Sequence, residues 1–285
     1  MKLFLLTALS CLMALPVYAE VKKDIPYGEK ARNQLDLYLP DGVDEPPMVV
    51  FIHGGRWFRN DKTQIENLDR VNQILDSGMA IASINYTFSS EAIWPAQLED
   101  LHAAFDFLRE NGATYGYDAD RMAVWGQSSG AHLALWAAFD QAQSPETALD
   151  GLVSWYAPSD LYEIIPDRAA DDVPDRDGMN KEPSPESLLI GATVPENEEL
   201  ADVASPLNFL ATLPAETILP DTLLVHGSND FVISPLQTER LYDAMQAHGS
   251  SGKVEMRIVD GGGHGRPGFE PEVPAAIAFL KQVFD

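Results

Sequence analysis

The chain is almost without cysteine: Cys11 is the only one in 285 residues. It lies within residues 1–19, which we expect to be a secretory signal peptide. Lys2 supplies the positive start, a short apolar run follows, and the Val-Tyr-Ala ending at Ala19 is similar to a small-x-small cleavage site. Residues 20–285 would then hold no cysteine, so we expect an exported domain that uses neither disulfides nor thiol chemistry.

Long hydrophobic runs are also absent. The stretch Leu3–Leu15 is the strongest candidate, and it is shorter than the ~20 residues that a membrane-spanning helix needs. Lipidation of Cys11 is disfavoured, because Ala8 stands where a lipoprotein signal carries leucine and apolar residues continue past the cysteine. We therefore expect a secreted or periplasmic protein with no membrane anchor after cleavage following Ala19.

Positive charge is scarce as well. Lys and Arg together number 19 against 44 Asp and Glu, which gives a net charge of −25. Such a surface repels nucleic-acid phosphates and anionic lipid, so neither is an expected partner. A strongly anionic polymer would suit only a locally basic cleft. With no cysteine after Cys11 and no clustered histidines, we expect neither a zinc site nor another metal or cofactor.

Strand-like and helix-like patterns alternate along the rest of the chain. Strands are expected at residues 21–25, 34–39, 47–52, 79–85, 121–125, 151–155, 222–225 and 254–259, and helices at 63–77, 95–110, 235–248 and 271–284, with one more after Ser128. This order predicts an α/β fold: a mostly parallel eight-stranded sheet with helices on both faces, formed by one domain over residues 20–285.

Residues 159–213 interrupt this alternation and predict a small cap or lid-like insertion over the strand ends, where it would shape the mouth of a site. Five aspartates lie among its prolines: Asp167, Asp171, Asp172, Asp175 and Asp177. Their spacing lacks the pattern of a calcium loop, so we favour a solvated acidic loop. The sequence from Ser184 to Leu189 predicts a short capped helix.

The most informative motif is Gly-Gln-Ser-Ser-Gly at residues 126–130. It follows the strand 121–125 and opens a helix-like run, which is the context of a nucleophile elbow, where a sharp turn exposes a serine hydroxyl. Ser128 is therefore a candidate nucleophile. By itself the motif is weak, because glycine and serine are common in ordinary turns.

A serine nucleophile needs a basic histidine and an acid to orient it. His264 lies in a glycine-rich loop directly after the strand 254–259, and we prefer it to His226 and His248. Asp230 follows the strand 222–225 and is the candidate acid, with Asp260 as the alternative. The chain order of nucleophile, acid and base is the one that this fold requires.

The sequence His-Gly-Gly-Arg-Trp at residues 53–57 follows the strand 47–52, where backbone amides can bind the oxyanion of a tetrahedral intermediate. Trp57, Phe88 and Trp94 are candidates to line an acyl or aryl pocket, although aromatic residues near sheet ends are more often part of the core.

These motifs together give the chain a resemblance that covers nearly all of residues 20–285. It resembles α/β-hydrolase esterases of the hormone-sensitive-lipase-like and carbohydrate or feruloyl esterase-like branches. The matching positions are residues 50–55 with Trp57, 61–62, 85–86, 94–95 with Asp100, 117–118, 120–121, 126–134, 205–207, 226–227 with Asp230, and 263–265.

The resemblance implies a triad of Ser128, Asp230 and His264, and an oxyanion hole formed by the amides of Gly55, Arg56 and Ser129. Arg56 departs from the family pattern, which has a third glycine there; its side chain could crowd the mouth or recognise a carboxylate or a sugar hydroxyl.

The leading hypothesis is hydrolysis of small acyl or aryl esters, including esters on carbohydrate, through an acyl-enzyme. An arylformamidase-like amide hydrolase is the alternative, and a non-catalytic binding protein is a third.

Overall fold

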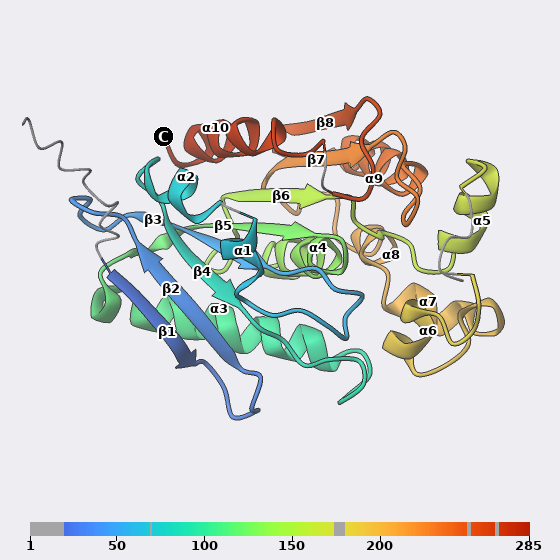
Figure 1. Ribbon diagram of the computed structural model, residues 1–285, viewed down its shortest axis with the longest axis horizontal. Helices are drawn as coiled ribbons and strands as arrows, with labels where there is room; N and C mark the ends of the chain where they lie inside the picture. The colour runs from blue at the N-terminus through green and yellow to red at the C-terminus, as the bar shows by residue number, and fades with distance from the viewer. Residues whose placement is uncertain (1–19, 69, 174–179, 250–251, 266–267) are drawn as a thin grey trace, which may run out of the picture.

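The computed structural model describes residues 20–68, 70–173, 180–249, 252–265 and 268–285 (Figure 1). The expected signal peptide, residues 1–19, lies outside the described residues, and so do Asp175 and Asp177 of the insertion.

Eight strands form one open sheet with the order β1-β2-β4-β3-β5-β6-β7-β8. Their bounds are β1 Glu20–Pro26, β2 Gln34–Leu39, β3 Pro47–Ile52, β4 Ala80–Ile84, β5 Asp118–Gln127, β6 Gly151–Trp155, β7 Asp221–Gly227 and β8 Val254–Val259. The pairs β1–β2 and β2–β4 are antiparallel and the other pairs are parallel. The predicted α/β class and the mostly parallel eight-stranded sheet are confirmed.

The central strands are apolar along their whole length because both faces of the sheet are covered. All six residues of β3 are buried, and successive side chains enter different cores: Val50 packs in one cluster and Phe51 in the other. These two clusters lie on opposite sides of the sheet, since side chains alternate along a strand.

Helices cover both faces, as predicted. The helices outside the insertion are α1 Gln64–Asn67, α2 Val71–Leu75, α3 Ala96–Tyr115, α4 Ser129–Gln141, α9 Leu236–Ala247 and α10 Glu272–Phe284. The buried residues of α3, α4 and α9 join the core that contains Val50, and those of α1, α2 and α10 join the core that contains Phe51.

Two helices differ from their predicted bounds. Residues 63–77 form α1 and α2 instead of one helix, and Arg70, just before α2, places its guanidinium over the ring of Trp155 at 4.3 Å. The helix predicted at residues 95–110 continues to Tyr115, because Gly112 lets the helix pack closely on the chain beyond it: a Cβ there would lie 2.7 Å from that of Ala119.

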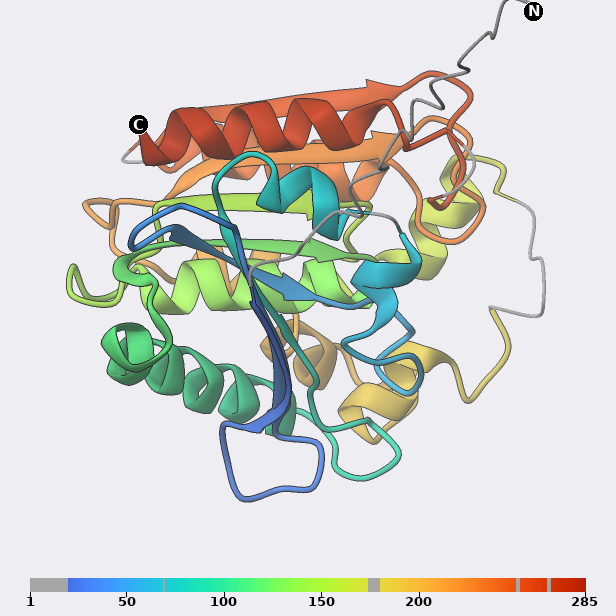
Figure 2. The same cartoon turned by 60° about the vertical axis from the view of Figure 1, so that its left-hand side comes forward.

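The insertion contributes α5 Ile164–Ala170, α6 Pro185–Ile190, the 3₁₀ helix η2 Val194–Glu196, α7 Glu198–Val203 and α8 Pro206–Leu210. Both views show α5 to α7 beyond the carboxyl ends of the parallel strands (Figures 1 and 2). Ser184 caps α6, since its hydroxyl accepts a hydrogen bond from the amide of Ser187 at 3.1 Å.

The acidic segment agrees only in part with the solvated loop we expected, since Asp171 and Asp172 are exposed but Asp167 is not. Residues 164–170 are helical, and Asp167 is buried, where it accepts hydrogen bonds from Gln237 and Arg240 of α9. Asp171 accepts a hydrogen bond from the hydroxyl of Ser234. These aspartates therefore anchor the insertion to the domain. Among the described helices, none is long and apolar enough to cross a membrane.

Candidate active site

Ser128 lies between β5 and α4 with φ 54° and ψ −128°. This backbone conformation is costly for a residue with a side chain, by about 1–3 kcal/mol, and is held by the structure around it. The flanking glycines make it possible: a Cβ on Gly126 would lie 2.2 Å from the carbonyl of Gly130, and one on Gly130 would lie 2.2 Å from the carbonyl of Ile52. The motif thus packs the turn directly against β3.

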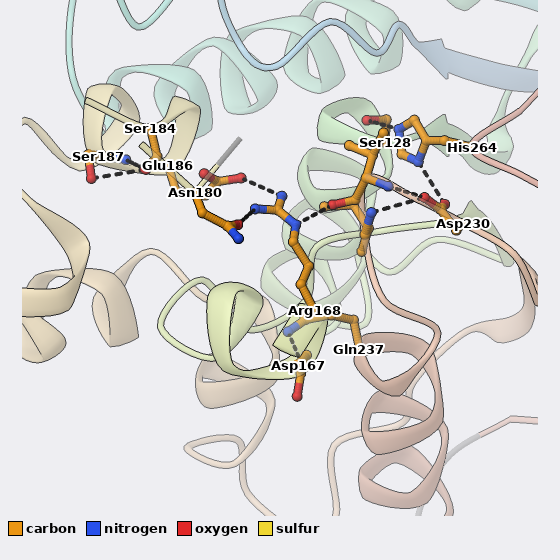
Figure 3. A network of polar contacts seen from close by, with 12 residues as sticks. Ser128, Asp167, Arg168, Asn180, Ser184, Glu186, Ser187, Asp230, Gln237 and His264 are labelled. Carbon is orange, nitrogen blue, oxygen red and sulfur yellow. Dashed lines mark hydrogen bonds and ion pairs between the residues drawn. The ribbon is translucent and has the colours of Figure 1, made fainter. Parts of the chain in front are cut away.

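The structure brings Ser128, His264 and Asp230 together (Figure 3). The Ser128 hydroxyl lies 2.9 Å from His264 Nε2, and His264 Nδ1 lies 2.7 Å from Asp230 Oδ2. An ionised carboxylate only accepts, so Nδ1 carries the proton and Nε2 is left to accept the serine proton. Asp260, the alternative acid, is exposed at the end of β8.

Asp230 is buried and its second oxygen is also occupied. Oδ1 accepts hydrogen bonds from the amides of Val232 at 2.7 Å and Ile233 at 3.0 Å. Burial raises the pKa of this carboxyl, but the charge of His264 and hydrogen bonds from His226 and His264 outweigh burial, so the pKa lies well below its usual range. Asp230 is therefore anionic at neutral pH.

His226 supports the same loop. Its Nε2 donates to the carbonyl of Ile233 at 3.0 Å and lies 3.4 Å from Asp230 Oδ2, while Nδ1 accepts from the Thr238 hydroxyl at 2.6 Å. His226 therefore orients the loop that carries Asp230. His248 ends α9 and contacts the carbonyl of Thr217.

The turn after β3 lies against the nucleophile, since a Cβ on Gly54 would lie 3.2 Å from that of Ser128. Gly55 has φ 143°, and the turn then continues with Arg56 at φ 58°. Ser129 is the first residue of α4, where amides lack partners within the helix. The amides of Gly55, Arg56 and Ser129 thus come from the two turns that meet at Ser128, and their role in an oxyanion hole stays a prediction.

A cavity of about 480 Å³ opens beside Ser128. Its lining residues come from both turns, from the start of α1, from the ends of β5 and β6, and from the loops after β7 and β8: Gly54, Gly55, Arg56, Arg59, Asn60, Gln64, Gln127, Ser128, Tyr156, Phe231, Val232 and His264. A volume of this size suits a small ester.

The three aromatic side chains predicted to line the pocket lie elsewhere. Trp57 is buried and donates from its indole to His132 Nδ1 at 3.2 Å, and the Trp94 ring packs 5.8 Å from that of His132. Phe88 lies beneath the guanidinium of Arg32, at 3.3 Å. Trp57 and Phe88 join the core that contains Val50, and Trp94 packs against that core, in keeping with the core alternative.

Tyr156 is a cavity residue that sequence reasoning missed. It follows β6 with φ 42°, and its ring centroid lies 4.5 Å from that of His264. Burial raises the pKa of Tyr156 to about 12, so its hydroxyl is protonated and donates to Gln127 Oε1 at 3.4 Å. Its place could have been found, because residues that follow central parallel strands line the crevice of such sheets.

The insertion reaches the triad through Arg168, which is fully buried on α5 (Figure 3). Its Nε donates to the carbonyl of Val232 at 2.6 Å, and Nη1 donates to Asn180 Oδ1 at 3.1 Å. Nη2 lies 4.0 Å from Glu186 Oε1. Arg168 thus holds the loop whose amides hold Asp230. Within the described residues, no three His, Cys, Asp or Glu side chains are grouped so that they could hold a metal ion.

A nucleophile elbow at the carboxyl end of β5, with an acid after β7 and a histidine after β8, defines the α/β-hydrolase class. The chain belongs to the BD-FAE family, whose model matches residues 35–245. The sequence-based resemblance to α/β-hydrolase esterases is therefore confirmed.

Relatives of known description are esterases. A probable isoprenylcysteine alpha-carbonyl methylesterase of Oryza sativa subsp. japonica is 29% identical over 257 residues, which cover 86% of this chain and 57% of the relative. The esterase LipQ of Mycobacterium tuberculosis is 28% identical over 248 residues, or 82% of this chain and 55% of LipQ. The chain spans little more than half the length of these curated relatives.

Solved structures agree with the fold. A truncated carbohydrate esterase from gut microbiota superposes with a TM-score of 0.78 at 26% identity, covering 93% of this chain and 96% of the other. A bifunctional GH43-CE protein of Bacteroides eggerthii gives a TM-score of 0.76 at 29% identity, covering 93% of this chain and 38% of the other.

Proposed function

We propose that this protein is a serine esterase that cleaves carboxylic esters through an acyl-enzyme intermediate. The observation that carries the proposal is the continuous chain of hydrogen bonds from Ser128 through His264 to Asp230 at the wall of a cavity. The names of the relatives support ester cleavage, and none of the relatives named here supports the arylformamidase-like alternative.

In the first half of the reaction, Ser128 Oγ attacks the ester carbonyl carbon while His264 Nε2 takes the hydroxyl proton. The carbonyl oxygen becomes an oxyanion that the amides of Gly55, Arg56 and Ser129 would bind. When the intermediate collapses, the bond to the alcohol oxygen breaks, and His264 returns its proton to that oxygen. Asp230 stays anionic and stabilises the charged imidazole.

In the second half, water replaces the alcohol. His264 takes a proton from the water as it attacks the acyl-enzyme carbonyl, and then gives the proton to Ser128 Oγ as the acid leaves. The products are one carboxylic acid and one alcohol for each water consumed. Small acyl or aryl esters, including esters on carbohydrate, are the substrates we propose, because the cavity is of matching size.

The proposal is tested with Ser128→Ala. Wild-type protein should react with a fluorophosphonate probe and hydrolyse p-nitrophenyl acetate, and the variant should not be labelled and should lose about 10⁴-fold or more in kcat, because no other group replaces the nucleophile. Ser129→Ala is the matched control, since it keeps the amide and removes only a neighbouring hydroxyl. Labelling of Ser128→Ala, or full hydrolysis by it, would contradict the proposal.

Secretion and cleavage after Ala19 stay predictions, as does the lid-like role of residues 159–213.

A further inference from the structure

The cavity beside Ser128 is positively charged in a protein that is strongly negative. Its lining contains two arginines, Arg56 and Arg59, and among the described residues that line it there is no aspartate or glutamate. The whole chain has only 19 basic residues against 44 acidic ones. Two guanidinium groups at the wall of one small cavity therefore run against the composition of the rest of the surface.

Arg56 occupies a position that is unfavourable for an arginine. Its φ of 58° lies in the left-handed region, and the next residue, Trp57, has φ 59°. A residue with a Cβ in this region costs about 1–3 kcal/mol where the structure around it enforces the conformation, and such strain collects at functional sites. Glycine would relieve the strain and still supply a backbone amide. A role for the guanidinium would therefore explain why this position holds arginine instead of glycine.

The turn that carries both arginines is rigid. The amide of Arg59 donates to the carbonyl of Gly55 at 3.1 Å, and Asn60 Nδ2 donates to the carbonyl of Gly54 at 2.8 Å. A Cβ on Gly55 would lie 2.0 Å from the carbonyl of Arg59, so the two ends of the turn touch. Both arginine side chains are therefore presented from a fixed backbone next to the nucleophile.

Two carboxylates lie close to these basic groups and the triad, on Glu186 and Asp230. Glu186 is buried on α6; burial raises its pKa, and the charges of Arg168 and Arg56 lower it. Glu186 thus interacts with both Arg168 and Arg56, and Arg59 adds a further positive charge at the cavity. The Asp230 carboxylate is bonded to His264.

We propose that the cavity selects esters that carry a carboxylate on their acyl or alcohol part, with the guanidinium groups of Arg56 and Arg59 binding that carboxylate while Ser128 attacks the ester carbonyl. This inference rests on the proposed esterase function and names its substrate class. Arginine only donates hydrogen bonds and matches a carboxylate with two parallel bonds, which favours an anion over a neutral hydroxyl.

The test compares pairs of esters that differ only in charge. Monoethyl glutarate against ethyl glutaramate places the carboxylate on the acyl side, and 3-acetoxybenzoate against 3-acetoxybenzamide places it on the alcohol side. For wild-type protein we expect kcat/KM to favour the anion by about tenfold in one of the two pairs, because a charge-assisted hydrogen bond is stronger than a neutral one. The pair that shows the preference identifies the side.

Arg56→Gln and Arg59→Gln should each lower this ratio towards one, mainly through a higher KM for the anionic ester. Arg56→Gly should do the same while keeping the amide and suiting the backbone. The matched control is Arg257→Gln on β8, where the lost guanidinium pairs with Glu272 and does not line the cavity; its ratio should equal that of wild type. Thermal melting checks that each variant folds. If the Arg56 variants unfold, the ratio measured for Arg59→Gln tests the inference, because Arg59 is exposed and its substitution should not disturb folding.

Ratios of one or less in both wild-type pairs would overturn the inference, and so would a preference that survives the combined Arg56→Gln and Arg59→Gln changes. Hydrolysis of the neutral esters in those cases would leave the proposed function standing. Absence of hydrolysis of every ester, together with absence of fluorophosphonate labelling, would instead overturn the proposed function and this inference with it.

Discussion

The catalytic centre of Ser128, Asp230 and His264 and the insertion at residues 159–213 are joined through the loop after Asp230, where Arg168 contacts Val232, but they are held in place in different ways. Ser128 directly follows β5, and Asp230 and His264 lie in the short loops after β7 and β8, so the sheet sets the positions of all three. The insertion is anchored by polar side chains distant in sequence: Gln237 Oε1 accepts from the amides of Ser159 and Asp160, both at 2.8 Å. Local backbone geometry determines the first region, and tertiary contacts determine the second.

The two regions should therefore respond differently to substitution. In the catalytic centre of Ser128, Asp230 and His264, a substitution that changes a single atom should abolish catalysis and leave the protein folded. In the insertion, loss of one side-chain contact should lower the stability of the protein. It should change the catalytic rate only through the loop after Asp230. Three substitutions test this division.

The largest effect is expected for Asp230→Asn. The amide can still accept hydrogen bonds from Val232 and Ile233 through Oδ1, but Nδ2 donates where a carboxylate accepted, so His264 would adopt the wrong tautomer. Serine proteases use the same Ser-His-Asp triad, and there the change from Asp to Asn lowers kcat by about 10⁴-fold. We expect a loss of that order in p-nitrophenyl ester hydrolysis, with little change in melting temperature.

The matched control is Asp260→Asn, which changes the alternative acid at the exposed end of β8. It should leave kcat at the wild-type value. A loss in Asp260→Asn with none in Asp230→Asn would reverse the assignment of the acid.

Next in size is Arg168→Met, which cuts the link between the insertion and the loop after Asp230. It removes the hydrogen bond to the Val232 carbonyl and a charge that faces buried Glu186. Breaking such a buried pair typically costs about 3–5 kcal/mol of stability. We expect urea denaturation to show a loss of this order, and kcat to fall by about tenfold since the loop that holds Asp230 loosens.

Arg240→Gln is the control for Arg168→Met. Arg240 of α9 forms ion pairs with Glu163 and with Asp167, which is on the same insertion helix as Arg168. Arg240→Gln thus weakens the anchoring of α5 and keeps the bond from Arg168 to Val232. It should lower stability and leave kcat unchanged. Equal loss of kcat in both variants would mean that the insertion acts on the triad as a whole layer and not through Arg168.

The smallest effect concerns His132, where the two regions meet. This buried ring accepts from Trp57 at Nδ1 and donates from Nε2 to the carbonyl of Ala204 at 2.8 Å, so it is neutral. Burial lowers its pKa to about 4. Between pH 4 and the unfolded value of 6.5, the unfolded chain binds the proton and the folded protein does not, so stability falls as pH falls through this window.

The expected contribution is about 3 kcal/mol, lost progressively as the pH drops from about 6.5 to 4. His132→Gln should show a smaller loss of unfolding free energy than wild type between neutral and mildly acidic urea titrations, because glutamine does not titrate. His53, which is also buried and has a pKa of about 4, keeps its own share in both proteins. Parallel pH profiles would contradict the assignment.

The sequence allowed the positions of the strands along the chain, the elbow and the residues after the strand ends to be predicted, because each depends on local pattern. Ser128, Asp230 and His264 were all found in this way, and the structure brings them within hydrogen-bond distance. The residues that line the cavity were mostly not predicted, because Trp57, Phe88 and Trp94 do not line it. Trp57 and Trp94 pack around His132 of α4, a contact that no local pattern reveals.

The insertion shows the same limit more strongly. The capped helix after Ser184 follows a local rule and was predicted. The burial of Asp167 depends on Gln237 and Arg240, which lie about seventy residues further along the chain. A run of aspartates therefore predicted solvent exposure where the fold supplies partners.

The position of His264 has a consequence for the timing of biosynthesis. It follows β8, an edge strand that pairs only with β7, and α10 packs near these strands at the end of the chain. A growing chain contains the elbow and the turn after β3 long before it contains its base. Ser128 would thus gain its general base only after β8 has paired with β7. A chain that ends before β8 would contain Ser128 but would not hydrolyse esters at the rate of the complete domain.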